Sequence, residues 1–265
     1  MAQNLQSENA AQDFNPLLQA LLLDDHLARQ KEIDAILKEF DEDKAVSLLF
    51  GALLKSPHSE SRKQIVDELA KIGSAKAVEV LAIIIAHDFD PEIQREAVEA
   101  LKRIGSDKAV DALLTALRSG DEYGARWYVA RALGSFRSDR VVDGLIEAAK
   151  DYDVAGIAVS SLIQIGSDRA IEGLITISQN MLHGAGTISD DAMVGLVRLG
   201  TEKAINRLLQ VWNESNRIHR SRVSLLLHHF KPTHLIAPLS QRLQNKPLPS
   251  DERETAAEML GIIGT

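Results

Sequence analysis

Apolar and polar residues follow a helical period through almost the whole chain. Between residues 109 and 117, apolar side chains recur three or four positions apart, which is the spacing of one face of an amphipathic helix. Residues 91–104 have the same period, and their apolar stripe consists of Ile93, Ala97, Leu101 and Ile104. Only a few residues separate the two segments. The pattern therefore predicts short helices joined by tight turns.

These helical segments repeat. The sequence Leu-Ala-Lys-Ile-Gly-Ser-Ala-Lys-Ala-Val at residues 69–78 returns with small changes at 101–110, 162–171 and 196–205. Weaker copies have Phe-Asp, Phe-Arg or Phe-Lys in place of Ile-Gly. The glycine-equivalent positions are 29 to 34 residues apart, at 41, 73, 105, 137, 166, 200, 231 and 264. One helix pair cannot bury its apolar face alone, so neighbours must stack. We therefore expect an all-α fold, a right-handed α-solenoid of about eight two-helix repeats.

Each strong copy carries signals for one helix to end and the next to begin. A glycine follows the last apolar residue, where the chain favours a left-handed conformation. The next residue is a serine or threonine, which can cap the first turn of a new helix. The second helix of one repeat begins with Asp90 as its predicted cap and Pro91 at its first position. The predicted glycine ends are Gly73, Gly105, Gly166 and Gly200.

Residues 90–105 and 121–134 resemble the short HEAT-like repeat of the phycobilisome-lyase type, and the resemblance extends over about residues 28 to 265. The family includes the E/F-type bilin lyases, which attach or remove the chromophore of phycobiliproteins, and proteins linked to phycobilisome degradation. Other members are adaptors, and one type is tied to iron–sulfur cluster assembly in cyanobacteria. Residues 126–136 are similar to a segment of the lyase E subunit, but they lack its tandem tryptophan. The resemblance implies a helical solenoid that binds other proteins.

Composition narrows the function classes. The net charge of −8 and the pI near 5.5 do not fit a non-specific nucleic-acid binder. The chain has no cysteine, which excludes disulfides, thiolate metal ligands and a cysteine nucleophile. The longest apolar run, at residues 80–86, is shorter than the roughly 20 residues that span a bilayer. We expect residues 1–15 to be a disordered tail, residues 16–265 to be a single solenoid, and the protein to be cytoplasmic, without membrane insertion.

The outward face of the second helices is the predicted partner surface. If Ala125, Val129 and Leu133 form the core stripe of the fourth second helix, together with Phe136, then Trp127 points away from the core. In solenoids of this kind the second helices line the concave side. Tryptophan and arginine are common at interface hot spots, so Trp127 is the expected anchor; the alternative is that it packs on the adjacent repeat. The predicted partner-binding residues are Arg95, Glu99, Tyr123, Trp127, Arg131, Gly156 and Ser160.

A series of arginines occupies one repeat-equivalent position. It has two interpretations: each arginine pairs with a carboxylate or a helix C-terminus nearby, or together they form a track for an acidic ligand such as bilin propionates. The histidines cluster late in the chain but lack the spacing of a metal site. Neither catalytic residues nor metal ligands are predicted. The arginines of the series are Arg62, Arg126, Arg220 and Arg253.

These patterns lead to three functional hypotheses. The first is a protein-binding scaffold, adaptor or chaperone acting on phycobiliproteins or phycobilisomes, with no cofactor of its own. The second, implied by the resemblance, is a subunit of a bilin lyase that works with a second HEAT-repeat subunit and handles phycocyanobilin. The third is an adaptor in iron–sulfur cluster assembly. A lyase should bind free bilin, whereas an adaptor should bind a folded protein and ignore the pigment.

Overall fold

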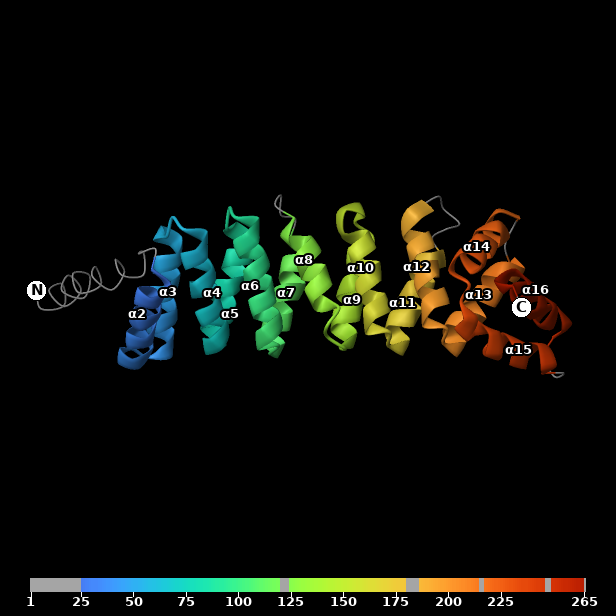
Figure 1. Ribbon diagram of the computed structural model, residues 1–265, viewed down its shortest axis with the longest axis horizontal. Helices are drawn as coiled ribbons and strands as arrows, with labels where there is room; N and C mark the ends of the chain where they lie inside the picture. Colours follow the sequence, from blue (N-terminus) through green and yellow to red (C-terminus); the bar gives the residue numbers. More distant parts are fainter. Residues whose placement is uncertain (1–24, 120–123, 180–185, 215–216, 246–248, 265) are drawn as a thin grey trace, which may run out of the picture. The chain divides into compact units, whose positions relative to one another are not determined.

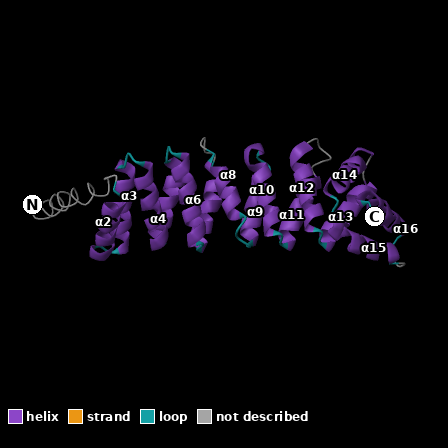
Figure 2. Cartoon of the chain, viewed as in Figure 1, coloured by secondary structure: helices purple, strands orange, loops and turns teal. Residues whose placement is uncertain are grey.

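The structure is a computed structural model that describes residues 25–119, 124–179, 186–214, 217–245 and 249–264. These residues form helices joined by short loops, and the described part contains no strand (Figures 1 and 2). The chain divides into two compact units, the first ending at Leu133 and the second beginning at Gly134. Each is a stack of helix pairs. The predicted all-α repeat architecture is therefore confirmed.

The first unit has two layers of helices. The first helices of successive repeats, α3, α5 and α7, contact one another in order, and so do the second helices, α4, α6 and α8 (Figure 1). We call the second helix of each repeat its B helix. The bounds are α2 (His26–Glu39), α3 (Glu42–Lys55), α4 (Ser59–Ile72), α5 (Ala75–His87), α6 (Pro91–Ile104), α7 (Asp107–Arg118) and α8 (Ala125–Leu133).

The second unit, taken by itself, has the same two layers of helices. The B helices α10, α12, α14 and α16 contact one another in order, and α9, α11 and α13 contact one another as the first helices do in the first unit. The bounds are α9 (Asp139–Ala148), α10 (Tyr152–Ile165), α11 (Asp168–Gln179), α12 (Gly186–Leu199), α13 (Glu202–Glu214), α14 (Arg217–Phe230), the 3-10 helix η2 (Thr233–Leu235), α15 (Ile236–Gln244) and α16 (Ser250–Ile263).

The helix ends follow the sequence signals. Gly105 ends α6 in the left-handed conformation with φ 61°, and the side chain of Ser106 accepts a hydrogen bond from the backbone N–H of Ala109 at 3.2 Å. Asp90 caps α6 with Pro91 in its first turn. Lys231 stands where other copies have glycine, and it also has a positive φ, of 40°. The left-handed turn is therefore kept at Lys231 without a glycine, whereas Asp41, at the equivalent position of an earlier copy, is extended with φ −62°.

One predicted boundary is wrong. We expected the core stripe of the fourth B helix to continue to Phe136, but α8 ends at Leu133 and Phe136 is half-buried outside the helix. Ala125, Val129 and Leu133 are fully buried, as predicted. The reason for the early end is Gly134, which follows Leu133 and has a low helix propensity. No helix among the described residues is long and apolar enough to cross a membrane.

Candidate functional site

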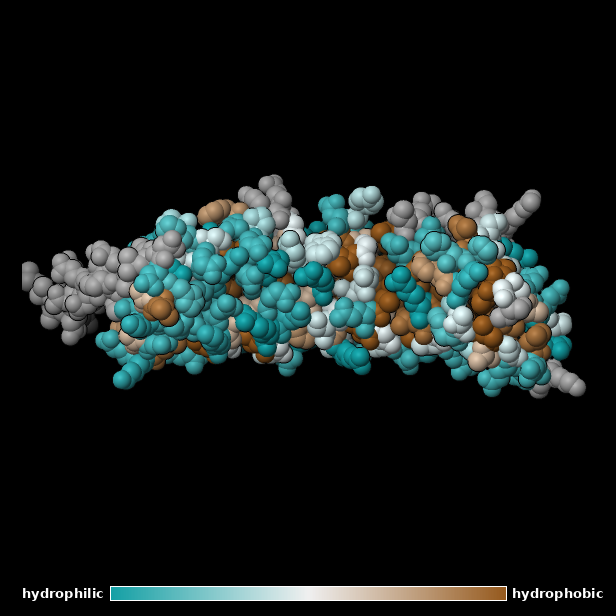
Figure 3. All heavy atoms as spheres, in the orientation of Figure 1, coloured by the Kyte–Doolittle hydropathy of each residue, from teal (hydrophilic) through white to brown (hydrophobic). Residues whose placement is uncertain are grey.

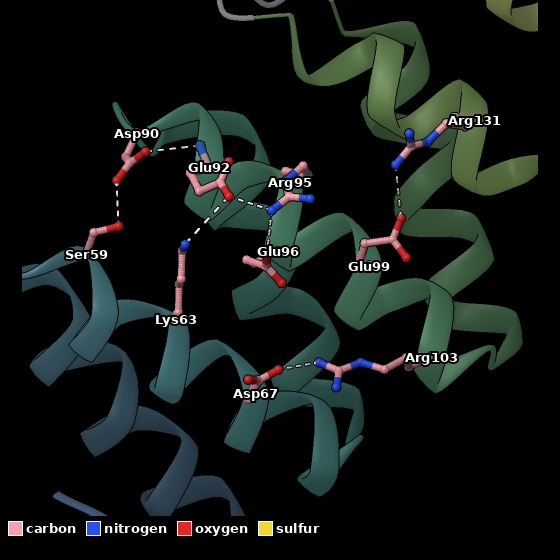
Figure 4. Close-up of polar contacts among 10 residues, drawn as sticks. All are labelled: Ser59, Lys63, Asp67, Asp90, Glu92, Arg95, Glu96, Glu99, Arg103 and Arg131. Carbon is pink, nitrogen blue, oxygen red and sulfur yellow. Dashed lines mark hydrogen bonds and ion pairs between the residues drawn. The ribbon is translucent and has the colours of Figure 1, made fainter. Parts of the chain in front are cut away.

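The B helices of the first unit present a continuous polar face. Ile93, Ala97 and Leu101 of α6 are fully buried in the core of the first unit, so the opposite side of this helix faces outward. Figure 3 shows mainly hydrophilic side chains over α4 and α6. We call this surface the B-helix face and define it by Lys63, Asp67, Glu92, Arg95, Glu96, Glu99, Lys102, Arg103, Trp127 and Arg131, most of which Figure 4 shows.

Ion pairs connect α4 to α6 across this face. Glu92 Oε1 lies 2.5 Å from Arg95 and 3.5 Å from Lys63 on the neighbouring helix. Arg95 also contacts Glu96 at 2.9 Å (Figure 4). Two carboxylates and two cations therefore balance in this group. Since every pair is partly exposed, we expect each to contribute little to stability while holding the side chains in place.

The pKa values of this group reflect the pairing. The pKa of Glu92 is lowered, first because Arg95 donates a hydrogen bond to its carboxylate and further because Arg95 and Lys63 are positively charged. The pKa of Arg95 is raised, mainly because Glu92 accepts its hydrogen bond. Both side chains therefore keep their charges at neutral pH.

A second ion pair joins α4 and α6 near the C-terminal end of α6. Arg103 donates a hydrogen bond to Asp67 Oδ1 at 2.6 Å, and both side chains are about half exposed. Figure 4 shows this pair apart from the group around Glu92. One carboxylate and one cation balance here as well.

The aromatic part of the face lies on α8. The guanidinium of Arg131 lies over the ring of Trp127, 5.2 Å from its centroid, which is a cation–π contact. Trp127 also meets the ring of Tyr128 edge-on, with the centroids 5.3 Å apart. Trp127 is 41% exposed, a large fraction for a tryptophan. The face therefore offers one stacked aromatic and cationic pair beside the ion-paired residues.

Glu99 links this pair to α6. Its Oε1 lies 3.8 Å from Arg131, while its Oε2 accepts a hydrogen bond from Lys102 at 2.9 Å. The carboxylate of Glu99 is thus shared by Arg131 and Lys102, so these three side chains together carry a net positive charge. On the B-helix face, the charges of the ion pairs between α4 and α6 therefore cancel, whereas the group that includes Arg131 of α8 has a net positive charge.

The structure brings four of the seven predicted partner-binding residues together. Arg95 and Glu99 lie on α6, and Trp127 and Arg131 lie on α8. Gly156 and Ser160 are exposed on α10 in the second unit, and Tyr123 lies outside the described residues. The predicted outward orientation is thus observed for the six described positions; their role in binding a partner stays a prediction.

The arginine series is mostly structural. Arg62 is buried and forms an ion pair with Asp88, the residue that ends α5. Arg126 donates a hydrogen bond to the carbonyl of Leu117 at 2.9 Å, in the last turn of α7. In the second unit, Arg220 likewise donates to the carbonyl of Trp212 at 2.8 Å, and Arg253 leaves a buried Nε without a hydrogen bond among the described residues. Three of the four arginines therefore follow the pairing interpretation.

A groove that the sequence did not suggest lies in the first unit. It has a volume of about 220 Å³ and a mainly apolar lining that includes Phe50, Leu54, Ile83 and Phe89. Phe89 is 76% exposed, and its ring covers the guanidinium of Arg62 at 4.5 Å. In the sequence, the signal for this groove is Phe89, an aromatic residue between two aspartates in a loop.

The described residues contain no group of three or more histidine, aspartate or glutamate side chains that could hold a metal ion. His228 and His229, in the late histidine cluster, are both exposed on α14. His234 Nε2 donates a hydrogen bond to the carbonyl oxygen of Val197 at 2.9 Å. His228 and His229 therefore lie on the surface, and His234 pairs with the backbone.

Comparison with known proteins identifies the repeat. The family model of HEAT repeats matches residues 14–102, 80–163 and 110–181, which together cover more than half of the chain. No curated protein matches the chain in sequence. The predicted HEAT-like repeat is thus confirmed.

Several solved structures are similar to this one, all at low identity. The complex of CpcE and CpcF of phycocyanin lyase from Nostoc sp. PCC7120 is 17% identical with a TM-score of 0.41, and the match covers 82% of this chain and 94% of that chain. Human deoxyhypusine hydroxylase is 17% identical with a TM-score of 0.35, over 98% and 99% of the two chains. An engineered protein is 22% identical with a TM-score of 0.38, over 84% and 96%.

Proposed function

The chain belongs to the HEAT-repeat family, and from this premise we propose that it acts as a protein-binding scaffold, an adaptor or chaperone, through its B-helix face. The observation that carries the proposal is the exposed Trp127 stacked with Arg131. A large aromatic side chain exposed beside an arginine is typical of an interface hot spot, because its burial removes much apolar area from water.

The rest of the face supports this role. Lys63, Glu92 and Arg95 are held by one another, so they lose little conformational freedom when a partner binds. A polar rim around an aromatic anchor is the usual anatomy of a protein interface. The proposed contact residues are those predicted from the sequence: Arg95, Glu99, Tyr123, Trp127, Arg131, Gly156 and Ser160. The single repeat domain over residues 16–265 stays a prediction, and residues 1–15, predicted from the sequence as a tail, lie outside the described part of the chain.

For the client we propose a phycobiliprotein or a phycobilisome component, in the cytoplasm of a cyanobacterium. This proposal comes from the resemblance of residues 90–105 and 121–134 to the repeats of phycobilisome lyases. Two alternatives come from the same resemblance. In the first, the chain is a bilin lyase subunit that needs a second HEAT-repeat subunit and takes bilin as a substrate. In the second, it is an adaptor in iron–sulfur cluster assembly whose client supplies the cluster ligands.

Affinity capture from the native host tests the proposal. The wild-type chain and the double variant Trp127→Ala/Arg131→Ala are used side by side, and bound proteins are identified by mass spectrometry. Arg103→Ala is the matched control, because Arg103 is not among the proposed contact residues and pairs with Asp67 rather than with Trp127 or Arg131. The proposal expects partners that the double variant loses and the control keeps. An unchanged partner list in the double variant contradicts it.

Titration with free phycocyanobilin then separates adaptor from lyase. An adaptor leaves the absorbance of the pigment unchanged and binds a folded client in the absence of bilin. A lyase subunit, alone or with a second HEAT-repeat subunit, shifts the absorbance. Phycobiliprotein subunits among the captured partners support either pigment-related hypothesis, whereas proteins of iron–sulfur cluster assembly support the third.

A further inference from the structure

Arg131 differs from the other arginines of the B-helix face. Arg95 has carboxylate partners at 2.5 and 2.9 Å, and Arg103 has one at 2.6 Å. The side chain of Arg131 makes no hydrogen bond within the described residues, and its nearest carboxylate oxygen there is 3.8 Å away on Glu99. Figure 4 shows that single contact. Its guanidinium therefore has hydrogen-bond donors available to a partner.

The orientation of this guanidinium is already restricted. Its contact with the ring of Trp127 places it beside the indole, and 46% of the Arg131 side chain is exposed. A stacked arginine loses less side-chain entropy when it forms a further contact, since part of that entropy is lost already. The free donors and the exposed indole thus form one surface on α8.

The charges around Arg131 favour an anionic partner. Glu99 is shared with Lys102, whose amino group is closer, at 2.9 Å, so two cations face one carboxylate. The other charged groups of the face are balanced among themselves. One added negative charge would complete this group of three. A carboxylate supplies one, and its two oxygens fit the paired donors of a guanidinium.

From these contacts we infer that the Trp127–Arg131 pair binds an acidic segment of a partner protein. A glutamate or aspartate carboxylate of the partner pairs with Arg131, and a neighbouring apolar side chain of the same segment packs on the exposed part of the Trp127 ring. This inference rests on the proposed function, because it names the chemistry of the partner at the same face. A phosphate fits less well, because its charge of about −1.5 to −2 exceeds the local imbalance of one positive charge.

Selection from a library of random peptides displayed on phage tests this inference with the full chain as the target. The wild type, Trp127→Ala, Arg131→Ala and Arg103→Ala are used in parallel. The expected result is enrichment of peptides with aspartate or glutamate next to a leucine, isoleucine or aromatic residue. Synthetic versions of these peptides should bind Arg131→Ala at least about tenfold more weakly than the wild type, a loss of about 1.4 kcal/mol. They should bind Arg103→Ala within about twofold of the wild type.

The outcomes separate the two proposals. Peptides that require Trp127 but carry no acidic residue, or that bind Arg131→Ala as tightly as the wild type, overturn the acidic-segment inference and leave the partner surface standing. Failure to select any peptide that requires Trp127 overturns both proposals at this face. Replacing the acidic residue of a selected peptide with its amide should weaken binding by about tenfold, and added salt should weaken the acidic form more than the amide form.

Discussion

Arg62 and Asp88 form an ion pair inside the first unit, with only 5% of each side chain exposed. Asp88 ends α5 and also accepts a hydrogen bond from the backbone N–H of Asp90, which caps α6. The pair thus connects the B helix of one repeat with the turn that begins the next B helix. This contact gives the arginine series a structural role that is independent of any ligand.

Removal of Arg62 should strongly destabilise the first unit. Arg62→Ala leaves the carboxylate of Asp88 buried without its partner, so we expect a loss of about 3–5 kcal/mol in the free energy of unfolding. Arg103→Ala breaks an exposed pair and should cost less than about 1 kcal/mol. Denaturant unfolding followed by circular dichroism measures both. Equal losses in the two variants would show that burial does not decide the strength of these pairs.

Replacing Lys231 with glycine should stabilise the second unit. Lys231 has φ 40°, a conformation that glycine adopts without steric cost. We expect Lys231→Gly to raise the free energy of unfolding by up to about 1 kcal/mol, with the higher entropy of the unfolded glycine offsetting part of the gain. A melting temperature below that of the wild type would contradict this interpretation of the turn.

Two glycine-to-alanine changes in helices of the second unit should have opposite effects. A Cβ at Gly173 would lie 2.5 Å from Cδ1 of Ile146, so Gly173→Ala should cost about 1–3 kcal/mol through overpacking. A Cβ at Gly156 would meet no heavy atom within 4 Å in the described structure, so Gly156→Ala should stabilise by up to about 1 kcal/mol. Thermal unfolding of the two variants provides the comparison. A stabilising Gly173→Ala would mean that α9 and α11 pack less closely than described.

The two tryptophans should respond differently to soluble quenchers. Trp127 is 41% exposed beside Arg131, whereas Trp212 is 7% exposed and donates a hydrogen bond to Glu258 at 2.7 Å. In Trp212→Phe, acrylamide should quench the remaining emission strongly, and iodide should quench it more than caesium because of the nearby guanidinium. In Trp127→Phe, quenching should be weak. Similar quenching in both variants would contradict the exposure of Trp127.

The ionisation of Glu92 should depend on Arg95. Arg95→Ala removes the main cause of the lowered Glu92 pKa, so that pKa should rise towards 4.5, as measured by NMR titration of the side chain. In the folded wild type the pKa lies below its unfolded value. The stabilising contribution of Glu92 is therefore present at neutral pH and is lost as the pH falls through the lowered pKa. Arg103→Ala should leave the Glu92 pKa unchanged.

Much of the fold could be predicted because its signals are local. Gly105 and Ser106 end one helix and begin the next through their own backbone and side-chain preferences, and the stripe of Ile93, Ala97 and Leu101 identifies the buried side of α6. The end of α8 departs from the repeat pattern because Gly134, with its low helix propensity, directly follows Leu133. The sequence therefore predicts a helix boundary well where the repeat pattern and the local helix propensity agree.

The candidate site was predicted only in part. The outward direction of Trp127 and Arg131 follows from the helical period, and it is observed. That Glu99 is shared by Lys102 and Arg131 depends on the packing of α6 against α8 and on side-chain rotamers, which the sequence does not specify. The groove beside Phe89 likewise combines residues from α3, α4, α5 and the loops between them, so no single segment indicates it.

The central claim is that a partner protein binds the B-helix face through Trp127. Calorimetric titration of a captured partner into the wild type, Trp127→Ala and Arg103→Ala tests it most directly. We expect Trp127→Ala to lose about 2 kcal/mol or more of binding free energy, roughly a thirtyfold rise in Kd, and Arg103→Ala to lose less than about 0.5 kcal/mol. The same Kd for Trp127→Ala and the wild type would contradict the claim.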